Sequence, residues 1–324
     1  MIPTWTQNID NIFTTTWSYR KGPAIEQAFE KTPLAFWLRE RQRVKNIPGH
    51  TRIEILLDYG SNDTLRWLGK GDTLPVTDSE FLTMAYEDWR YGGVNIVRFW
   101  QDDQRNKGQA RLVNYVEAKL NTAERSFWQE LERAFFADGT GAKEPNGFQN
   151  LIAVDPTSGV IHGLDRAQYP WFRNQSKAAS GVFSVFGVAD MRNFRNSLLR
   201  QSGTAAKDYT LVTDQVTFEA YEDELLDMKH IVNQQLADAG FEDQHVMFKG
   251  SPFLWSPQAP AAKIYFVNTN AIQLVCDEDE FLSMTEWKPV PDQPNDRMAQ
   301  IVLVLNMVTS RPVVNGVLHS ITYS

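Results

Sequence analysis

Cysteine is nearly absent from this sequence, since Cys276 is the single one among 324 residues. One cysteine can form neither a disulfide framework nor a cysteine-based metal cluster, and it is compatible with a reducing compartment. We expect Cys276 to be a small buried hydrophobe. Histidine is also scarce and scattered without the spacing of a metal site: the five lie at positions 50, 162, 230, 245 and 319. The sequence therefore predicts no metal site.

Long apolar runs are missing as well. The strongest, IVLVL at 301–305, ends at Asn306, far short of the roughly 20 residues that a membrane helix requires. The first residues, MIPTWTQNIDNIFTTTW, lack the basic start and unbroken apolar segment of a secretion signal. We expect neither a membrane span nor export by that route.

Basic residues are too few for a nucleic-acid-binding surface. The formal charge is −8; residues 1–50 contribute seven basic and four acidic side chains, and the rest of the chain contributes 25 and 36. The only mildly basic stretch is RERQRVK at 39–45. Because gripping phosphates requires a face rich in Lys and Arg, specific DNA binding is not expected.

The common motifs of nucleotide binding and nucleophilic catalysis are absent: there is no GxSxG elbow and no phosphate loop. DGTGAKEPNG is glycine-rich but follows a predicted helix rather than a strand, which is the wrong context for a dinucleotide site. DEDE at 277–280 could attract calcium, but it lacks the alternating ligands and central glycine of an EF-hand. We expect a solvated turn there and no cofactor.

Aromatic residues, in contrast, are abundant, with ten Trp and nineteen Phe. Such side chains bring large buried areas to cores and interfaces, so we expect extensive burial, including burial between subunits. The first fifty residues place Trp5 and Trp17 among polar residues with no sustained period, apart from a short helical candidate at 24–31. A segment of this kind is typical of an N-terminal arm that lies on another surface.

Residues 52–59 alternate as a half-buried strand does, with Ile53, Ile55 and Leu57 on one side. A second alternation, at 94–100, follows the flexible stretch GKGDTLP, so we expect a long hairpin or loop. Trp67 and Leu68 near its tip would be exposed apolar groups. The simplest explanation is that a neighbouring molecule covers these two side chains.

The clearest helix spans 109–136, where apolar residues recur at spacings of three and four and form a continuous stripe. At about 1.5 Å per residue it is about 40 Å long, and DGTG at 138–141 supplies the glycine that ends it. Further helices are predicted at 188–201 and from the N-cap Asp214 to about 240, and strands at 263–276 and 297–310. Segregated helices and strands indicate the α+β class.

The stretch GVIHGLDRAQYPWFRNQ at 159–175 is the strongest candidate for chemistry, because His162 with Asp165 could serve as a base and its orienter in an intracellular hydrolase. No nucleophile can be identified from the sequence. The favoured interpretation is structural: Asp165 and Arg166 fix a turn that Trp171 and Phe172 anchor. The protein is thus expected not to be an enzyme.

The order of these segments resembles the major capsid proteins of tailed bacteriophages, which have the Hong Kong 97 type of fold. The likeness covers nearly the whole chain: arm, extended loop, spine helix ending in DGTG, then NGFQNLIAV, GLDRAQYPWFRNQ, FEAYEDELL, LADAGF, FKGSPFLW and IYFVNTNAIQL. GLDRA followed by WFRN, and DAGF followed by FKG, are the most specific parts.

The resemblance implies five segments. These are an N-terminal arm at 1–50, an extended loop hairpin at 51–100, a peripheral domain with the spine helix at 101–140, an axial domain at 141–260, and peripheral return strands at 261–324, whose end can rejoin the axial domain. It implies that hexamers and pentamers close an icosahedral shell around double-stranded DNA. The extended loop would lie across an adjacent subunit, with Trp5, Trp17, Trp67 and Leu68 in contacts between subunits.

The resemblance also implies partners and a location. The chain would be part of the virion and would assemble in the host cytoplasm, with a portal protein and, in some shells, decoration proteins. Family members that scaffold themselves carry a long helical extension not found here, which favours a separate scaffolding protein. Lys70 lies where some members form a lysine-to-asparagine bond, but we expect an ordinary exposed lysine. A capsid decoration or adaptor protein remains a further alternative.

Overall fold

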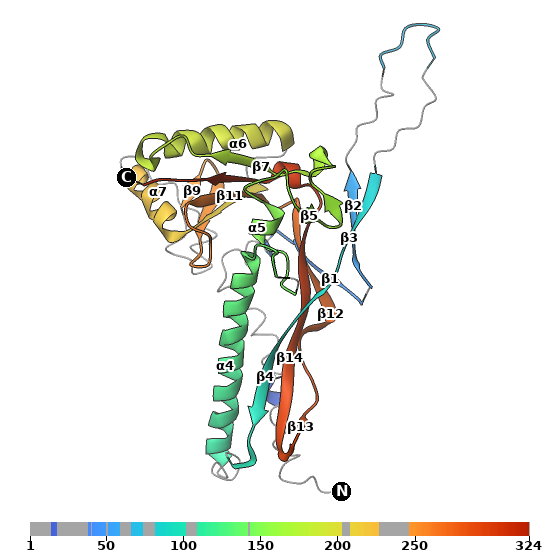
Figure 1. The fold of residues 1–324 in the computed structure, drawn as a ribbon, viewed down its shortest axis with the longest axis vertical. Helices are drawn as coiled ribbons and strands as arrows, with labels where there is room; N and C mark the ends of the chain where they lie inside the picture. Colours follow the sequence, from blue (N-terminus) through green and yellow to red (C-terminus); the bar gives the residue numbers. More distant parts are fainter. Residues whose placement is uncertain are drawn as a thin grey trace.

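Two β-sheets and three long helices form most of the described chain (Figure 1). The computed structural model describes residues 14–17, 38–39, 41–49, 51–58, 66–73, 82–101, 109–141, 143–202, 208–226 and 246–323. One sheet and the helix α4 form an elongated arm, and the other sheet with α6 and α7 lies across one end of it. Helices combined with sheets that contain both parallel and antiparallel pairs confirm the α+β prediction.

The elongated sheet is built around its longest strand, β14 (Gln293–Thr309). Along one edge β14 pairs with β12 (Ile272–Met284) and β13 (Lys288–Val290), and along the other with β4 (Arg90–Arg98). The fifth strand, β1 (Val44–Ile47), runs parallel to β12. From residue 304 to 309 every side chain of β14 is buried, so the strand is covered on both faces as its apolar run predicts.

The helix α4 (Gln109–Phe135) lies along this sheet beside β4 (Figure 1). Its bounds confirm the prediction to within one residue. The predicted stripe is buried toward the sheet at Leu120, Ala123, Phe127 and Leu131. Past the helix end the chain turns at Gly139, whose φ of 77° favours glycine, as the DGTG segment predicts.

The six-stranded sheet has the order β7–β15–β11–β8–β10–β9. Its strands are β7 (Gln175–Ala178), β8 (Tyr209–Thr213), β9 (Met247–Phe248), β10 (Ser251–Trp255), β11 (Lys263–Asn268) and β15 (Gly316–His319). Two predicted helices pack on it. In α6 (Val188–Ser202), Met191, Phe194 and Leu198 are buried as expected. In α7 (Gln215–Leu226), Asp214 caps the start by accepting the Thr217 N–H; the predicted continuation to 240 lies outside the described residues.

The expected hairpin exists, but its second strand is not the segment at 94–100 that the alternation predicted. The strand β2 (Ile53–Asp58) pairs in continuous antiparallel register with β3 (Leu82–Glu87), a strand that the sequence did not reveal. The alternation at 94–100 belongs instead to β4, which pairs with β14. The apolar side chains of β4 pack against the long sheet and α4, so this segment does not need a partner strand in the hairpin.

The single strand expected at 263–276 is also two strands. A turn after Asn268 separates β11 from β12: the Asn270 N–H donates to Asn268 Oδ1 at 2.9 Å, and the Ala271 N–H donates to the Asn268 carbonyl at 3.0 Å. Because β11 lies in the six-stranded sheet and β12 in the five-stranded one, the chain crosses between the sheets at this turn. Asparagine favours such turns by bonding its own backbone.

Short elements that connect the two sheets are α5 (Phe148–Leu151), β5 (Val160–Ile161), β6 (Leu164–Asp165), η1 (Pro170–Phe172) and η5 (Pro312–Val314). Another short element, η2 (Phe183–Gly187), lies between β7 and α6. The helical candidate at 24–31 lies outside the described residues.

Candidate functional site

The tip of the extended loop presents a fully exposed tryptophan. Trp67 is 99% exposed and Leu68 is 48% exposed. A turn fixes the backbone beside them, since Asp72 Oδ2 accepts the Gly69 N–H at 2.7 Å and the Asp72 N–H donates to the Gly69 carbonyl. Gly71 has φ 100°, which suits glycine, and Lys70 is exposed within the same turn. The turn thus presents an apolar pair to solvent.

The β2–β3 ribbon is apolar on both faces. Its inner face buries Ile53, Ile55 and Leu57 in the core. Its outer face leaves Leu56, Met84 and Tyr86 between 44% and 62% exposed, and Leu56 lies directly opposite Met84. Contiguous apolar surface of this kind marks an interaction site.

Of the two tryptophans predicted in the N-terminal arm to contact other subunits, the structure describes one. Trp17 is only 3% exposed, and its indole N–H donates to the Leu282 carbonyl of β12 at 3.2 Å. This hydrogen bond attaches the N-terminal arm at Trp17 to the long sheet of the same chain. Little of the Trp17 side chain is then left to contact another subunit. Trp5 lies outside the described residues. Subunit contact therefore remains a proposal carried by Trp67 and Leu68.

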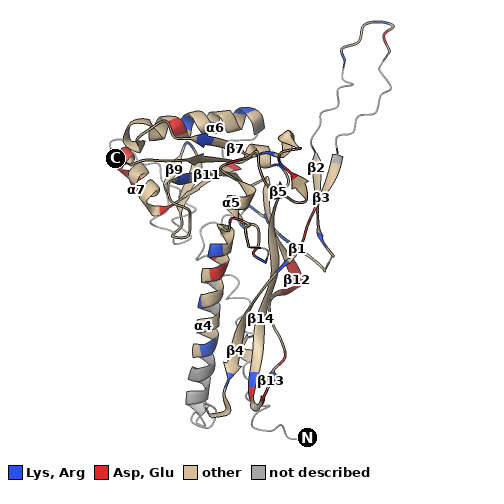
Figure 2. Ribbon diagram, in the orientation of Figure 1, with Lys and Arg blue, Asp and Glu red and all other residues tan. Residues whose placement is uncertain are grey.

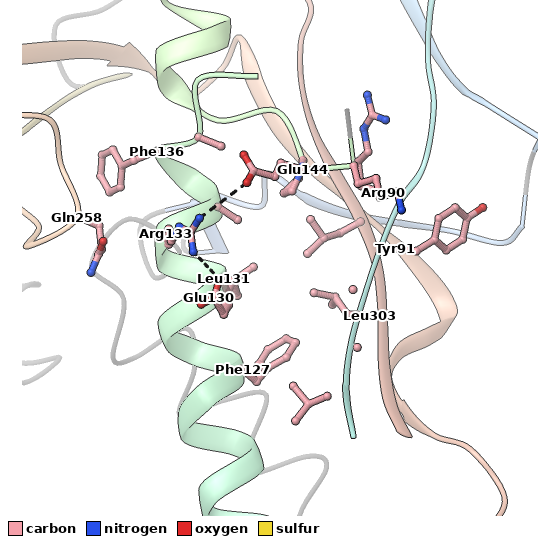
Figure 3. Close-up of a pocket in the computed structure, with 18 of the residues that line it drawn as sticks. Arg90, Tyr91, Phe127, Glu130, Leu131, Arg133, Phe136, Glu144, Gln258 and Leu303 are labelled. Atoms are coloured by element: carbon pink, nitrogen blue, oxygen red, sulfur yellow. Dashed lines mark hydrogen bonds and ion pairs between the residues drawn. The ribbon is translucent and has the colours of Figure 1, made fainter. Parts of the chain in front are cut away.

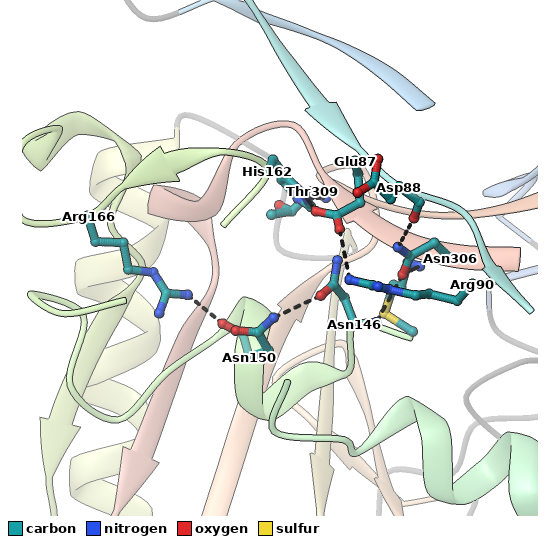
Figure 4. Close-up of polar contacts among 10 residues, drawn as sticks. Glu87, Asp88, Arg90, Asn146, Asn150, His162, Arg166, Asn306 and Thr309 are labelled. Carbon is teal, nitrogen blue, oxygen red and sulfur yellow. Dashed lines mark hydrogen bonds and ion pairs between the residues drawn. The ribbon is translucent and has the colours of Figure 1, made fainter. Parts of the chain in front are cut away.

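His162 does not form the dyad that a hydrolase would need. It occupies the β5–β6 turn with φ 51°, and its side chain is inaccessible to solvent. Its Nε2 accepts the Thr309 N–H at 3.1 Å, so the ring proton must be on Nδ1, which donates to Glu87 Oε2 at 2.7 Å (Figure 4). Both nitrogens are thus used by partners other than Asp165, so the geometry does not support the alternative in which His162 and Asp165 act as a base and its orienter.

The surrounding contacts connect three parts of the fold (Figure 4). In β14, Asn306 donates from Nδ2 to the Asp88 carbonyl at 2.8 Å and accepts the Asn146 N–H at 2.9 Å. Burial raises the pKa of Glu87, but contact with His162 and the nearby Arg90 outweighs it, so this pKa lies below its ordinary value. The base of the hairpin is thereby fixed to the long sheet and to the segment that leads to the other sheet.

Asp165 and Arg166 fix a turn, as the favoured interpretation predicts. Asp165 Oδ1 accepts the Ala167 N–H at 2.8 Å. The buried guanidinium of Arg166 donates to the carbonyls of Asn150 and Leu151, and burial lowers its pKa to about 10. Phe172 is 1% exposed and anchors the segment. The stretch 159–175 is a structural connection between the sheets.

Of the residues in this junction, sequence reasoning missed Glu87 and Asn306. Asn306 had a signal, because it is a single amide inside an otherwise apolar strand, and a buried amide must find partners. Glu87 had no such signal in the sequence, because its role depends on a hydrogen bond with His162, which is 75 residues away.

The DEDE segment is a solvated irregularity in β12. Asp277 Oδ1 accepts the N–H groups of Asp279 and Glu280, and the residues from 278 to 280 are exposed. Within the described residues no group of three or more His, Cys, Asp or Glu side chains could hold a metal ion. Cys276 beside it is buried, which confirms that prediction and raises the pKa of its thiol to about 12. Among the described helices, none is long and apolar enough to cross a membrane.

Comparisons with known proteins identify the fold through structure alone. No protein-family model matches the chain, and no curated protein does. Among solved structures, the capsid of cyanophage A-1(L) is 14% identical with a TM-score of 0.61, covering 86% of this chain and 90% of the other. The capsid of a native GTA particle is 16% identical with a TM-score of 0.57, covering 88% and 89%.

An encapsulin complex from Synechococcus elongatus is also similar, at 9% identity and a TM-score of 0.52, with 89% of both chains covered. The similarity in each case covers more than four fifths of each chain, so it does not rest on one short motif. The chain has the Hong Kong 97-type fold of tailed-phage capsid proteins.

Proposed function

We propose that this chain is the major capsid protein of a tailed double-stranded DNA phage, which assembles as hexamers and pentamers into an icosahedral shell. The observation that carries the proposal is the likeness to capsid structures over most of the chain, for example at a TM-score of 0.61 to the cyanophage A-1(L) capsid. The protein would belong to the virion and assemble in the host cytoplasm. A separate scaffolding protein and a portal protein are the proposed partners, and decoration proteins are compatible with the role.

The two sheets correspond to the two domains that the proposal requires. The five-stranded sheet with α4 is assigned to the peripheral domain, and the six-stranded sheet with α6 and α7 to the axial domain. Because β11 belongs to the six-stranded sheet and β12 to the five-stranded one, we place the border between the axial domain and the peripheral return strands at the turn 269–271 rather than at residue 261. We also assign β15 to the axial domain, because it lies in the six-stranded sheet. The ribbon β2–β3 with its tip is assigned to the extended loop.

A structural role is favoured over the hydrolase alternative by the state of His162. A general base needs an accessible nitrogen lone pair near its substrate. In His162 the Nε2 lone pair accepts the Thr309 N–H, and the side chain is inaccessible to solvent. Charges of both signs also occur along α4 (Figure 2), which suits a container that does not hold DNA through one basic surface.

Trp67→Ala tests the proposed subunit contact. A tryptophan that fills a neighbour's surface is a typical interface hot spot, whose truncation costs about 2 kcal/mol or more for each contact. Since Trp67 is 99% exposed in the single chain, the mutant subunit should unfold at the parental temperature while its yield of particles falls. Thr73→Ala, at another exposed position of the segment 66–73, is the matched control and should assemble normally. Equal yields of Trp67→Ala and parent would count against the contact.

Electron microscopy with light scattering, over a range of concentrations and with candidate scaffolds added, tests the function itself. Closed particles or hexamer and pentamer rings are expected. A chain that stays monomeric under all conditions contradicts the proposal, and one that only coats preformed shells supports the decoration alternative. Because an encapsulin shares the fold, nuclease-protected double-stranded DNA in particles from the native source is the second expected result.

A further inference from the structure

The imidazole of His162 is hydrogen-bonded on both sides only in its neutral form (Figure 4). Its Nδ1–H donates to Glu87 Oε2 at 2.7 Å, and its Nε2 accepts the Thr309 N–H at 3.1 Å. A protonated imidazole carries N–H groups on both nitrogens and can accept no hydrogen bond. A proton added to Nε2 would therefore set two donors against each other, and the Thr309 N–H would lose its partner.

Thr309 itself offers an acceptor for that added proton. The residue is completely buried, and within the described part of the chain its Oγ1 has no hydrogen-bond partner. A buried hydroxyl without a partner costs about 1–3 kcal/mol, and valine has the same shape without that cost. Only Cα and Cβ separate Oγ1 from the nitrogen that His162 holds, so rotation about χ1 between staggered positions can bring the hydroxyl toward Nε2. The unused hydroxyl thus has a purpose in the protonated form.

The charged group in direct contact with the ring favours the added proton. The carboxylate of Glu87, from β3, accepts the Nδ1–H and would stabilise an imidazolium. Arg90 of β4 lies 3.6 Å from the same carboxylate and opposes the proton. The Arg90 side chain is 26% exposed and lines a pocket between α4 and β4 (Figure 3), whereas those of Glu87 and His162 are 11% and 0% exposed. Solvent therefore screens the opposing charge more than the favourable one.

Other charged groups near the ring are bonded elsewhere. In the same turn, Asp165 accepts a main-chain N–H and Arg166 donates to main-chain carbonyls of α5. Asp88, next to Glu87 in the chain, pairs with Arg52 at 3.0 Å on the surface. From η1 the ring of Phe172 packs edge to face against the imidazole, and β14 has no ionisable side chain between 298 and 309. Glu87 is thus the charged partner that matters most for the ring.

The Thr309 N–H lies where the chain crosses between the two sheets. Thr309 is the last residue of β14, and the N–H of Ser310 donates to the Ala271 carbonyl, in the turn between β11 and β12, at 3.0 Å. Glu87, in contrast, belongs to the base of the extended loop. The single imidazole of His162 therefore joins the loop base to this crossing point.

We propose that His162 is a proton-sensitive coupling between the extended loop and the junction of the two sheets. In its neutral form it holds both the Glu87 carboxylate and the Thr309 N–H. In its protonated form it keeps Glu87, donates its Nε2–H to Thr309 Oγ1 and releases the Thr309 N–H, so the end of β14 is loosened while the loop base stays attached. This device belongs to the folded chain itself and does not depend on the proposed function.

The pH dependence of the His162 ring nitrogen shifts, measured by NMR on the full chain from about pH 8 to about pH 4.5, tests the coupling. His162→Gln identifies the signals. Thr309→Val removes the acceptor of the protonated form and no hydrogen bond of the neutral one, so it should lower the midpoint of the His162 transition by about one pH unit. It should also unfold at or above the parental temperature at about pH 8. Thr309→Ser keeps both groups and should stay within about 0.3 unit of the parent. Equal midpoints in Thr309→Val and parent, or a His162 that stays neutral throughout, overturn the proposal.

Amide hydrogen exchange gives an independent readout in the unaltered chain. The protection of the Thr309 amide, corrected for the intrinsic effect of pH, should fall about tenfold as the pH passes down through the His162 midpoint, while the amides of β2 and β3 keep theirs. In His162→Gln, whose side chain does not titrate, the Thr309 protection should not change over the same range. Parental protection that is constant across the midpoint, or that falls equally throughout the fold, contradicts the coupling.

Discussion

Glu87 shows how one side chain can connect distant parts of the molecule. It ends β3 at the base of the extended loop and accepts a hydrogen bond from the Nδ1–H of His162, which lies in the segment that leads to the six-stranded sheet. It also lies 3.6 Å from Arg90 in β4. Thr309, at the end of β14, holds the other side of the same imidazole. Hydrogen bonds to a carboxylate are about twice as strong as neutral ones, so this junction fixes the loop base firmly.

Glu87→Gln should lower the free energy of unfolding by about 1–3 kcal/mol at neutral pH, because a charged acceptor becomes a neutral one. The folded state lowers the Glu87 pKa below 4.5, so its charge stabilises the fold above that pH, and the stabilisation is lost as the pH falls through the folded pKa. Denaturant unfolding at a series of pH values should show the parent and mutant converging below about pH 4.5. A difference that stays constant to pH 3 would contradict this role.

At the scale of elements, β3 and β4 show where sequence patterns succeed and fail. The alternation in β2 and the stripe of α4 are long and regular, so their bounds follow directly from the sequence. In LTMAYE of β3 the outward residues Met84 and Tyr86 are apolar too, although they are exposed. Because both faces of this strand carry apolar residues, the period-two pattern that would have revealed it is weak.

The corner between α4 and α5 depends on Gly147. A Cβ there would lie 2.3 Å from the Ala137 nitrogen and 2.8 Å from the Ala134 carbonyl oxygen, both backbone atoms that cannot move independently. Gly147→Ala should thus destabilise the chain by about 1–3 kcal/mol or more, measured by denaturant unfolding. Gly49→Ala is the control, since nothing lies within 4 Å of its added carbon. Equal stabilities of the two variants would show that the corner can relax.

At the scale of the whole molecule, the order of elements predicted the architecture, whereas the pairing of strands could not be read from it. The apolar run that contains β11 and β12 is continuous in sequence, yet its halves belong to different sheets. Only the partners of each half, β15 and β8 for one and β14 for the other, decide this. The exposed Trp67 was predictable, but the junction of Glu87, His162 and Thr309 depends on three segments that meet only after folding.

The arrangement of surfaces suits a subunit of a closed shell. The extended loop carries an apolar tip that the described part of the chain leaves uncovered, since Trp67 is 99% exposed. An exposed tip of this kind would favour nonspecific association in an isolated monomer. Many such contacts, each modest, would sum over a symmetric particle.

Cryo-electron microscopy of particles assembled from the purified chain tests this account most directly. The predicted result is an icosahedral shell of hexamers and pentamers in which residues 66–73 of one subunit lie on another subunit, with Trp67 buried in that contact. A chain that forms no closed particle, or a shell in which every tip contacts only its own subunit, would contradict it.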